Sequence, residues 1–358
     1  MITYKTTKGI VNKRALERRA TYWRTAYKSR ISEDGLLSKQ QQEQIISFYG
    51  PYTDTIGEVD IIFHNFYLEK TGSFDYRYMP IDFFYCFIDP FYNDWDMAPY
   101  IDNKANYWQI FQHIDQPEAY LYRVNNIWTD GNNNLISDEE IEKILKSDKE
   151  MVIKQANESE GGKNIFFIDG SYNEKKGKFY SACKQIKKDI VVQQLIKQSH
   201  IISSVNPSSI NTIRILSLLT QKEVKIYSAI LRMGVNYSRV DNISRGGIAC
   251  GIANDGRLKK YAYNYRGEKF LEHPTTKVEF NKIVIPNYEK AVELVKRAHP
   301  AIPNFRLVSW DIAFNENEKP LLVEANLCYG ELNLHQLCNG PVFGDDTQAV
   351  IDEVFEQR

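Results

Sequence analysis

The chain contains 358 residues, of which 43% are apolar, and its 45 basic and 46 acidic side chains give a formal net charge of -1. This length exceeds what one ordinary hydrophobic core serves, so we expect two or three subdomains. The balanced charge argues against a nucleic-acid partner, which favours a strongly basic surface. No apolar run approaches the roughly 20 residues of a membrane-spanning helix. The N-terminus has no signal-peptide core, and we expect a cytoplasmic protein.

The five cysteines are odd in number and show no C-x-x-C spacing. This pattern indicates neither a disulfide framework nor a zinc site. We interpret the cysteines as small buried apolar residues.

Residues 1–100 predict an N-terminal domain that is helical and rich in aromatic side chains. Residues 9–49 have a helical pattern, in which Ser38 and Gln41 form a capping box. The basic residues of this segment are typical of a solvated helix face, with an anionic ligand or a membrane surface as the alternative. Residues 61–100 are dense in aromatic residues and predict a packed layer of short strands or turns.

Residues 101–196 predict a first α+β subdomain. An amphipathic helix is expected from Asp102, and a second helix begins at the capping box of Ser137 and Glu140. Strands are expected at 120–124, 151–155, 165–168 and 189–196. The sequence of strand, polar Gly-rich loop and strand over 151–168 indicates a flap.

Residues 197–358 predict a second α+β subdomain. Its elements are two paired strands at 211–218 and 224–232, a turn at Asp255-Gly256, a helix over 287–299 and a closing hairpin.

The closing hairpin predicts a metal site. If the chain turns at Asn317-Glu318, Asp311 lies directly opposite Glu324, and Asn326 points to the same side. The opposite side is then apolar and holds Trp310, Ile312, Phe314, Leu321 and Val323. Two carboxylates and an amide suit Mg²⁺ or Mn²⁺, which also bind phosphate oxygens. The alternative is a surface hairpin with a solvated polar face.

Three cations occupy unusual positions in apolar strands. Lys154 lies within the strand at 151–155, where an α- or β-phosphate or a buried carboxylate would balance its charge. Arg214 and Arg232 lie on the hairpin of 211–218 and 224–232. A two-residue turn at Gln221-Lys222 places the two arginines on opposite faces, whereas a three-residue turn places them on one face.

Two Gly-containing segments predict close approach to a ligand. Gly161, Gly162 and Lys163 match no P-loop, although such a loop can close on phosphates; an ordinary flexible hairpin is the alternative. Asn242 and Arg245 precede a second glycine pair, and here the alternative is a turn with a surface arginine.

These motifs, in this order, resemble the ATP-grasp superfamily and more closely its sugar-transfer-associated family. The resemblance rests on Asn206–Ile215, Val240–Ile248, Trp310–Ala313 and Val323–Asn326, and extends upstream to His64–Tyr67 and Met79-Pro80. It implies an α+β ATP-grasp fold in which two α+β subdomains clamp ATP.

The resemblance also implies roles for individual residues. Lys104 and Lys154 would bind the α- and β-phosphates, and the flap with Gly161, Gly162 and Lys163 would bind the β- and γ-phosphates. The adenine would contact the segment Gln193, Gln194, Leu195 and Ile196. Relatives contact the ribose with a carboxylate that this chain lacks, and Lys197 and His200 are the nearest polar candidates. Asp311, Glu324 and Asn326 would hold one or two Mg²⁺ ions. Arg214, Arg232 and Arg245, with Asn242 nearby, would stabilise the γ-phosphate and the acyl phosphate.

The function implied is that of an ATP- and Mg-dependent carboxylate–amine ligase that works through an acyl phosphate. The family association implies a sugar-linked carboxylate and surface-polysaccharide synthesis. Two alternatives remain open: a sugar kinase on the same fold, and a nucleotide-binding partner of a glycosyltransferase without catalysis. No Ser-His-Asp or Cys-His arrangement stands out, which agrees with chemistry that needs positioning and charge rather than a protein nucleophile.

Overall fold

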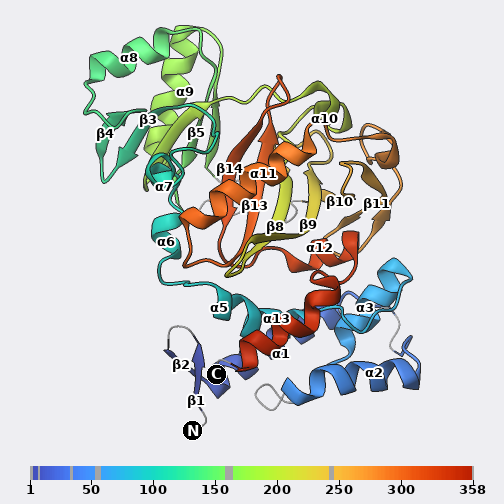
Figure 1. Ribbon diagram of the computed structural model, residues 1–358. Helices are drawn as coiled ribbons and strands as arrows, with labels where there is room; N and C mark the ends of the chain where they lie inside the picture. Colours follow the sequence, from blue (N-terminus) through green and yellow to red (C-terminus); the bar gives the residue numbers. More distant parts are fainter. Residues whose placement is uncertain are drawn as a thin grey trace.

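The computed structural model describes residues 3–6, 9–32, 35–52, 58–157, 164–241 and 246–356. In these ranges the strands form a seven-stranded, a five-stranded and a two-stranded sheet. Figure 1 shows the five-stranded unit above the seven-stranded sheet, with the N-terminal helices below. The α+β architecture predicted from the sequence is confirmed.

The N-terminal region is helical, as predicted. Its first long helices are α1 (Lys13–Lys28) and α2 (Lys39–Tyr49). The predicted capping box is present, because Ser38 accepts from the Gln41 amide and Gln41 accepts from the Ser38 amide. The predicted helical start at residue 9 is wrong, since β1 (Thr3–Thr6) pairs with β2 (Gly9–Asn12) before α1 begins.

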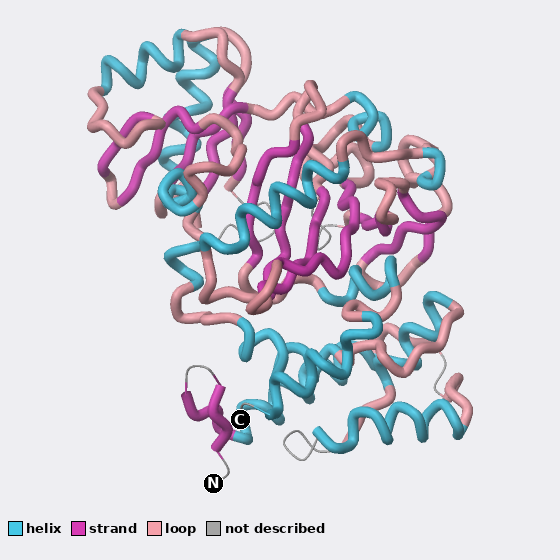
Figure 2. Tube along the Cα trace, viewed as in Figure 1, coloured by secondary structure: helices cyan, strands magenta, loops and turns pink. Residues whose placement is uncertain are grey.

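The aromatic segment 61–100 is also helical, which corrects the prediction of strands or turns (Figure 2). Its elements are α3 (Ile62–Thr71), α4 (Ile81–Phe83), a π-helical turn (Phe84–Ile88), α5 (Asp89–Tyr92) and α6 (Ala98–Ile101). The aromatic rings pack against neighbouring helices: Tyr27 of α1 contacts Phe63 and Phe66 edge-on. Tertiary packing therefore overrides the strand preference of aromatic residues.

The five-stranded sheet carries the first predicted α+β unit. Its strands, in spatial order, are β4 (Ile127–Asp130), β3 (Ala119–Val124), β7 (Ile190–Gln194), β5 (Met151–Gln155) and β6 (Ile165–Ile168). Helices α8 (Asp138–Lys146) and α9 (Tyr172–Gln185) share a hydrophobic core with it. The capping box of Ser137 and Glu140 begins α8, as predicted.

Two short helical elements stand where an amphipathic helix was expected from Asp102. The chain forms a 3₁₀ turn at Lys104–Asn106 and one helical turn, α7 (Tyr107–Ile110). The Gln116 side chain donates to the carbonyls of Tyr107 and Phe111, so these acceptors are satisfied without a further turn.

The seven-stranded sheet is antiparallel throughout and separates two cores. Its order is β12 (Lys269–Phe270), β11 (Leu258–Asn264), β10 (Ile248–Ile252), β9 (Val224–Met233), β8 (Ile213–Leu219), β13 (Leu307–Phe314) and β14 (Pro320–Asn326). Helix α11 (Tyr288–Ala298) packs on one face, where it shares a hydrophobic core with Trp310 and Ile312 of β13. The opposite face packs against α12 (Leu332–Asn339), α13 (Thr347–Glu356) and the N-terminal helices. The short helix α10 (His200–Val205) joins the two sheets.

No helix within the described ranges combines the length and apolar character needed to cross a membrane.

Candidate functional site

The β13–β14 hairpin places Asp311 opposite Glu324, but not through the predicted turn. Near the turn Phe314 pairs with Pro320, one residue out of the predicted register. The register then shifts between Ile312 and Asp311, so that Val323 is the extra residue of a β-bulge and Asp311 faces Glu324. The predicted apolar face is therefore wrong in part: Leu322, not Leu321 and Val323, packs with Trp310 and Ile312.

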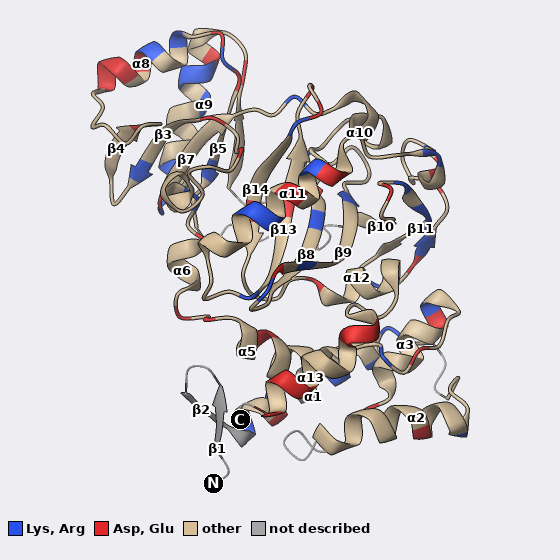
Figure 3. Ribbon diagram, viewed as in Figure 1, with Lys and Arg blue, Asp and Glu red and all other residues tan. Residues whose placement is uncertain are grey.

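A second bulge places Arg214 and Arg232 on one face of the sheet. Thr220 and Glu223 close the β8–β9 turn, which begins in the register of a two-residue turn. The register then shifts beyond Ser217, so that Arg214 pairs with Ile230 and Arg232 follows two residues later. The question that the sequence left open is thus settled by a bulge rather than by turn length. Figure 3 marks the basic positions of β8 and β9 in blue on the ribbon.

Asp311 is the centre of a buried charge network. Its Oδ1 accepts from Arg214 Nε at 2.8 Å, and its Oδ2 accepts from Arg214 Nη2 at 2.8 Å and from Arg232 Nη1 at 2.9 Å. All three side chains are buried. Burial opposes ionisation of the carboxyl, but the two guanidinium groups hold the pKa of Asp311 well below its usual range. Asp311 is therefore ionised and bridges both arginines.

Asn326 and Glu324 complete the polar face of the hairpin. The Asn326 amide donates to Ser309 O at 3.1 Å and lies 3.4 Å from Asp311 Oδ2. Glu324 Oε1 accepts from Lys104 Nζ at 2.6 Å. Burial lowers the pKa of Lys104, but Glu324 more than compensates and raises it, so the ammonium persists. This contact links the 3₁₀ turn beside the five-stranded sheet to the seven-stranded sheet.

Lys154 lies near Lys104 without a carboxylate of its own among the described residues. Burial and the charge of Lys104 lower the pKa of Lys154 to about 8. A buried carboxylate partner, the alternative considered from the sequence, is not found in the described part of the chain. An anionic ligand would supply the missing charge.

Replacing Lys154 by methionine is expected to stabilise the ligand-free protein at pH 7. The folded-state pKa of about 8 is below the value of roughly 10.4 in an unfolded chain. The folded state therefore disfavours the ammonium; this cost is full below pH 8 and disappears as the pH rises towards 10.4. Urea unfolding should show a gain on the order of 1 kcal/mol at pH 7 and none near pH 10.5, allowing for partial exposure.

The exposed Lys187 provides the control for that substitution, because Lys187→Met should leave stability unchanged at both pH values. A less stable Lys154→Met protein at pH 7 would contradict the assignment of Lys154 to a site that lacks its anion.

The structure adds two carboxylates that the sequence did not single out. Glu331 Oε2 accepts from Arg214 Nη1 at 2.6 Å and lies 3.8 Å from Arg232 Nε. Asp241 accepts from the Thr212 amide at 3.1 Å and from its hydroxyl, and burial raises the pKa of Asp241. Glu331 is 117 residues from Arg214 in the chain, so no local pattern indicated their contact.

The segment expected to contact adenine lies at the end of β7. Gln193 is buried between β3 and β5, and Gln194 is exposed. The amides of Gln194 and Leu195 donate to Glu118 O at 2.8 Å and Glu150 O at 3.0 Å. An adenine contact through these two amides would require them to exchange partners.

Of the remaining residues predicted for the nucleotide site, the structure describes Ile196 and His200. Ile196 is half-buried, and His200 is exposed at the first turn of α10. Gly161, Gly162, Lys163, Asn242 and Arg245 lie outside the described residues, and their roles stay predictions.

The donor set of the hairpin fits Mg²⁺. Among the described residues no group of three or more His, Cys, Asp or Glu side chains gathers as metal ligands. Two carboxylates and one amide share the polar face instead, and they are the oxygen donors that Mg²⁺ accepts alongside water and phosphate. From the described residues, Asp311 Oδ1 accepts one hydrogen bond, and it has two lone pairs. Asp311, Glu324 and Asn326 are therefore suitable ligands.

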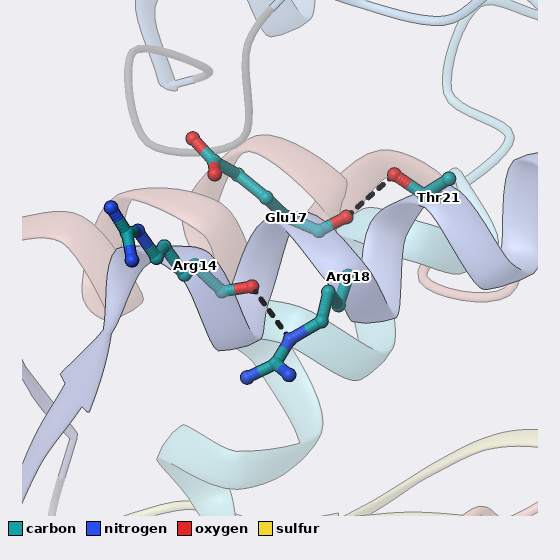
Figure 4. Close-up of a pocket in the computed structure, with 4 residues that line it drawn as sticks. All are labelled: Arg14, Glu17, Arg18 and Thr21. Carbon is teal, nitrogen blue, oxygen red and sulfur yellow. Dashed lines mark hydrogen bonds between the residues drawn. The ribbon is translucent and has the colours of Figure 1, made fainter.

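The basic N-terminal segment forms a surface depression on α1, away from the arginine pair. Arg14, Glu17, Arg18 and Thr21 line it (Figure 4). Arg18 Nε donates to Arg14 O at 3.3 Å, and Thr21 Oγ1 donates to Glu17 O at 2.7 Å. These contacts within one helix agree with a solvated helix face.

Comparisons with known proteins relate the chain to one family. A family model described as "sugar-transfer associated ATP-grasp" matches residues 87–351. No curated protein matches the sequence.

Several solved structures are similar at low identity. An L-amino acid ligase from Bacillus licheniformis is 13% identical, with 71% of this chain and 47% of that chain covered and a TM-score of 0.39. The biotin carboxylase domain of 2-oxoglutarate carboxylase from Hydrogenobacter thermophilus, solved with MgADP, is 13% identical over 72% and 46% of the two chains, with a TM-score of 0.44.

A D-alanine–D-alanine ligase from Bacillus anthracis is 12% identical over 75% of this chain and 68% of that chain, with a TM-score of 0.39. The chain thus spans about half the length of the first two of these proteins and about two thirds of the third.

Proposed function

Because the chain belongs to the sugar-transfer associated ATP-grasp family, we propose that it is an ATP-dependent ligase that joins a carboxylate to an amine through an acyl phosphate. Two of the similar structures are named as ligases, one for L-amino acids and one for D-alanine, and the proposal is consistent with those names. The substrate carboxylate attacks the γ-phosphate of ATP, ADP leaves, and an amine then displaces phosphate from the acyl phosphate.

The observation that carries this proposal is the row of charges across the sheet. Arg214, Asp311 and Glu324 are consecutive cross-strand neighbours on β8, β13 and β14. Lys104 contacts Glu324, and Arg232 donates to Asp311. Cations that now contact carboxylates can exchange them for phosphate oxygens, and the carboxylates are then available to a metal.

Each residue has a defined task in this reaction. Lys104 and Lys154 bind the non-transferred phosphates, and the buried position of Lys104 and the half-buried position of Lys154 strengthen this attraction. Arg214 and Arg232 orient the migrating phosphoryl group and later the acyl phosphate. Asp311, Glu324 and Asn326 would hold Mg²⁺, which neutralises phosphate oxygens when bound. In-line positioning is sufficient for phosphoryl transfer, so the site needs no nucleophilic side chain.

The family's association with sugar transfer supports a finer proposal, in which the carboxylate is sugar-linked and the product serves surface-polysaccharide synthesis. The need for ATP supports a cytoplasmic location. We also propose that residues 1–100, 101–196 and 197–358 act as the three functional parts, the last two providing the sides of the nucleotide site.

The test is a screen of uronic acids and amino acids, singly and with amines, for ATP-dependent phosphate release, followed by mass analysis of the product. An amide together with ADP and phosphate supports the ligase. A stable sugar phosphate would identify a kinase instead. Tight ATP binding without ADP release over the whole panel would identify a nucleotide-binding partner without catalysis.

A further inference from the structure

Glu331 is the carboxylate at the solvent side of the arginine pair. Its side chain is 28% exposed, while the side chains of Arg214 and Arg232 are 6% and 8% exposed. Only its Oε2 contacts the arginines, and Oε1 accepts no hydrogen bond from the residues that the structure describes. One oxygen therefore lies on the anion-binding arginines and the other is available to a second ligand.

The loop before α12 fixes the position of Glu331. The Tyr329 amide donates to the buried Asp89 Oδ2 at 3.1 Å, and Ser309 Oγ donates to Gly330 O at 2.9 Å. A Cβ at residue 330 would lie 2.5 Å from Ser309 Oγ, so a larger residue here would displace the side chain that bonds the loop to β13. Glu331 itself has a φ of 60°, a conformation that costs energy and is maintained by these contacts.

An amide-forming site must remove a proton from its amine. Amino groups have pKa values of about 8–10 and arrive as ammonium ions, which have no lone pair for attack. Among the other carboxylates of the described network, Asp311 binds two arginines, Glu324 binds Lys104, and Asp241 accepts from the amide and hydroxyl of Thr212. His335 is fully buried, and burial together with Arg214 lowers its pKa to about 3.

We propose that Glu331 binds the ammonium group of the second substrate, a primary amine, and takes one of its protons. This inference rests on the proposed ligase function and assigns the second half of that reaction. One proton moves to Glu331, the nitrogen lone pair forms the C–N bond at the acyl carbon, and the C–O bond to phosphate breaks with its electron pair on phosphate, which takes the second proton from the nitrogen. Glu331 then returns the proton to water.

The contact between Glu331 and Arg214 determines when in the reaction Glu331 can take the proton. While the Arg214 guanidinium contacts Glu331, it occupies Oε2 of that carboxylate. When the acyl phosphate occupies Arg214 and Arg232, it competes for the same donors, and Glu331 becomes available to the ammonium. Proton removal therefore follows phosphoryl transfer.

The experiment compares Glu331→Gln with the wild type. In both proteins the acyl phosphate formed from ATP reacts either with hydroxylamine or with an amine. Hydroxylamine is uncharged at pH 7 and traps acyl phosphates without needing a base, whereas an amino acid or alkyl amine needs deprotonation. We expect hydroxamate formation within about threefold of the wild type. Amide formation at pH 7 should fall about 10²-fold. The deficit should diminish as the pH approaches 10 and free amine accumulates.

Glu316→Gln, at an exposed position on the β13–β14 turn, is the control and should leave both reactions unchanged. Equal losses of hydroxamate and amide in Glu331→Gln, or an amide deficit that is independent of pH, would overturn the inference and identify Glu331 as a counter-ion of the arginines. The wild type decides the underlying function separately: absence of hydroxamate with every uronic acid and amino acid of the panel would refute the ligase, whatever Glu331 does.

Discussion

Replacing Asp311 by asparagine is expected to destabilise the protein by about 3–5 kcal/mol and to abolish ADP formation. The substitution removes the negative charge that Arg214 and Arg232 share at 2.8–2.9 Å, in a site where all three side chains are buried. Among the residues that the structure describes, the two buried guanidinium groups would then have only the partly exposed Glu331 as a carboxylate within ion-pair distance. Urea unfolding at pH 7 measures the stability.

Asp255→Asn is the matched control, because Asp255 forms an exposed ion pair with Arg257 at 3.8 Å. It should change the free energy of unfolding by no more than about 0.5 kcal/mol. A loss of stability in Asp311→Asn as small as in this control would show that the arginines do not depend on Asp311.

Replacing Glu324 by glutamine is expected to reduce ADP formation by at least about 10²–10³-fold, with the fold intact. The substitution removes a charged oxygen ligand from the metal face and the carboxylate that lies 2.6 Å from Lys104. Its side chain is 29% exposed, so the destabilisation should be much smaller than that of Asp311→Asn. ADP release and thermal unfolding measure the two effects.

Lys104→Met separates the two roles of that contact. It should weaken ATP binding equally with and without Mg²⁺, whereas Glu324→Gln should remove the dependence of ATP binding on Mg²⁺. Full turnover in Glu324→Gln, or an unchanged Mg²⁺ dependence of its ATP affinity, would refute the metal assignment.

Local hydrogen-bonding patterns were predictable from the sequence. The capping boxes at Ser38 and Ser137 both begin helices, because the bonds that define them lie within four residues. The aromatic segment was not predictable in this way, since Phe63 and Phe66 are helical through their contacts with Tyr27 in another helix.

The residues of the charged face were predicted from the sequence, but the strand register that brings them together was not. The assumed turn register is wrong, and Asp311 faces Glu324 only because the bulge at Val323 compensates for it. A bulge depends on packing across several strands, so a single strand pattern does not indicate it. Glu331 was missed for a related reason, because its contact with Arg214 needs a left-handed residue in a loop that β13 and Asp89 hold in place.

The most direct test of the acyl-phosphate reaction follows an oxygen atom. The carboxylate that supports phosphate release is labelled with ¹⁸O, and the phosphate formed from ATP is analysed by mass spectrometry. A ligase that works through an acyl phosphate transfers one labelled oxygen from the carboxylate to each phosphate. Unlabelled phosphate, or a phosphorylated product that accumulates instead of an amide, would contradict the reaction proposed for this site.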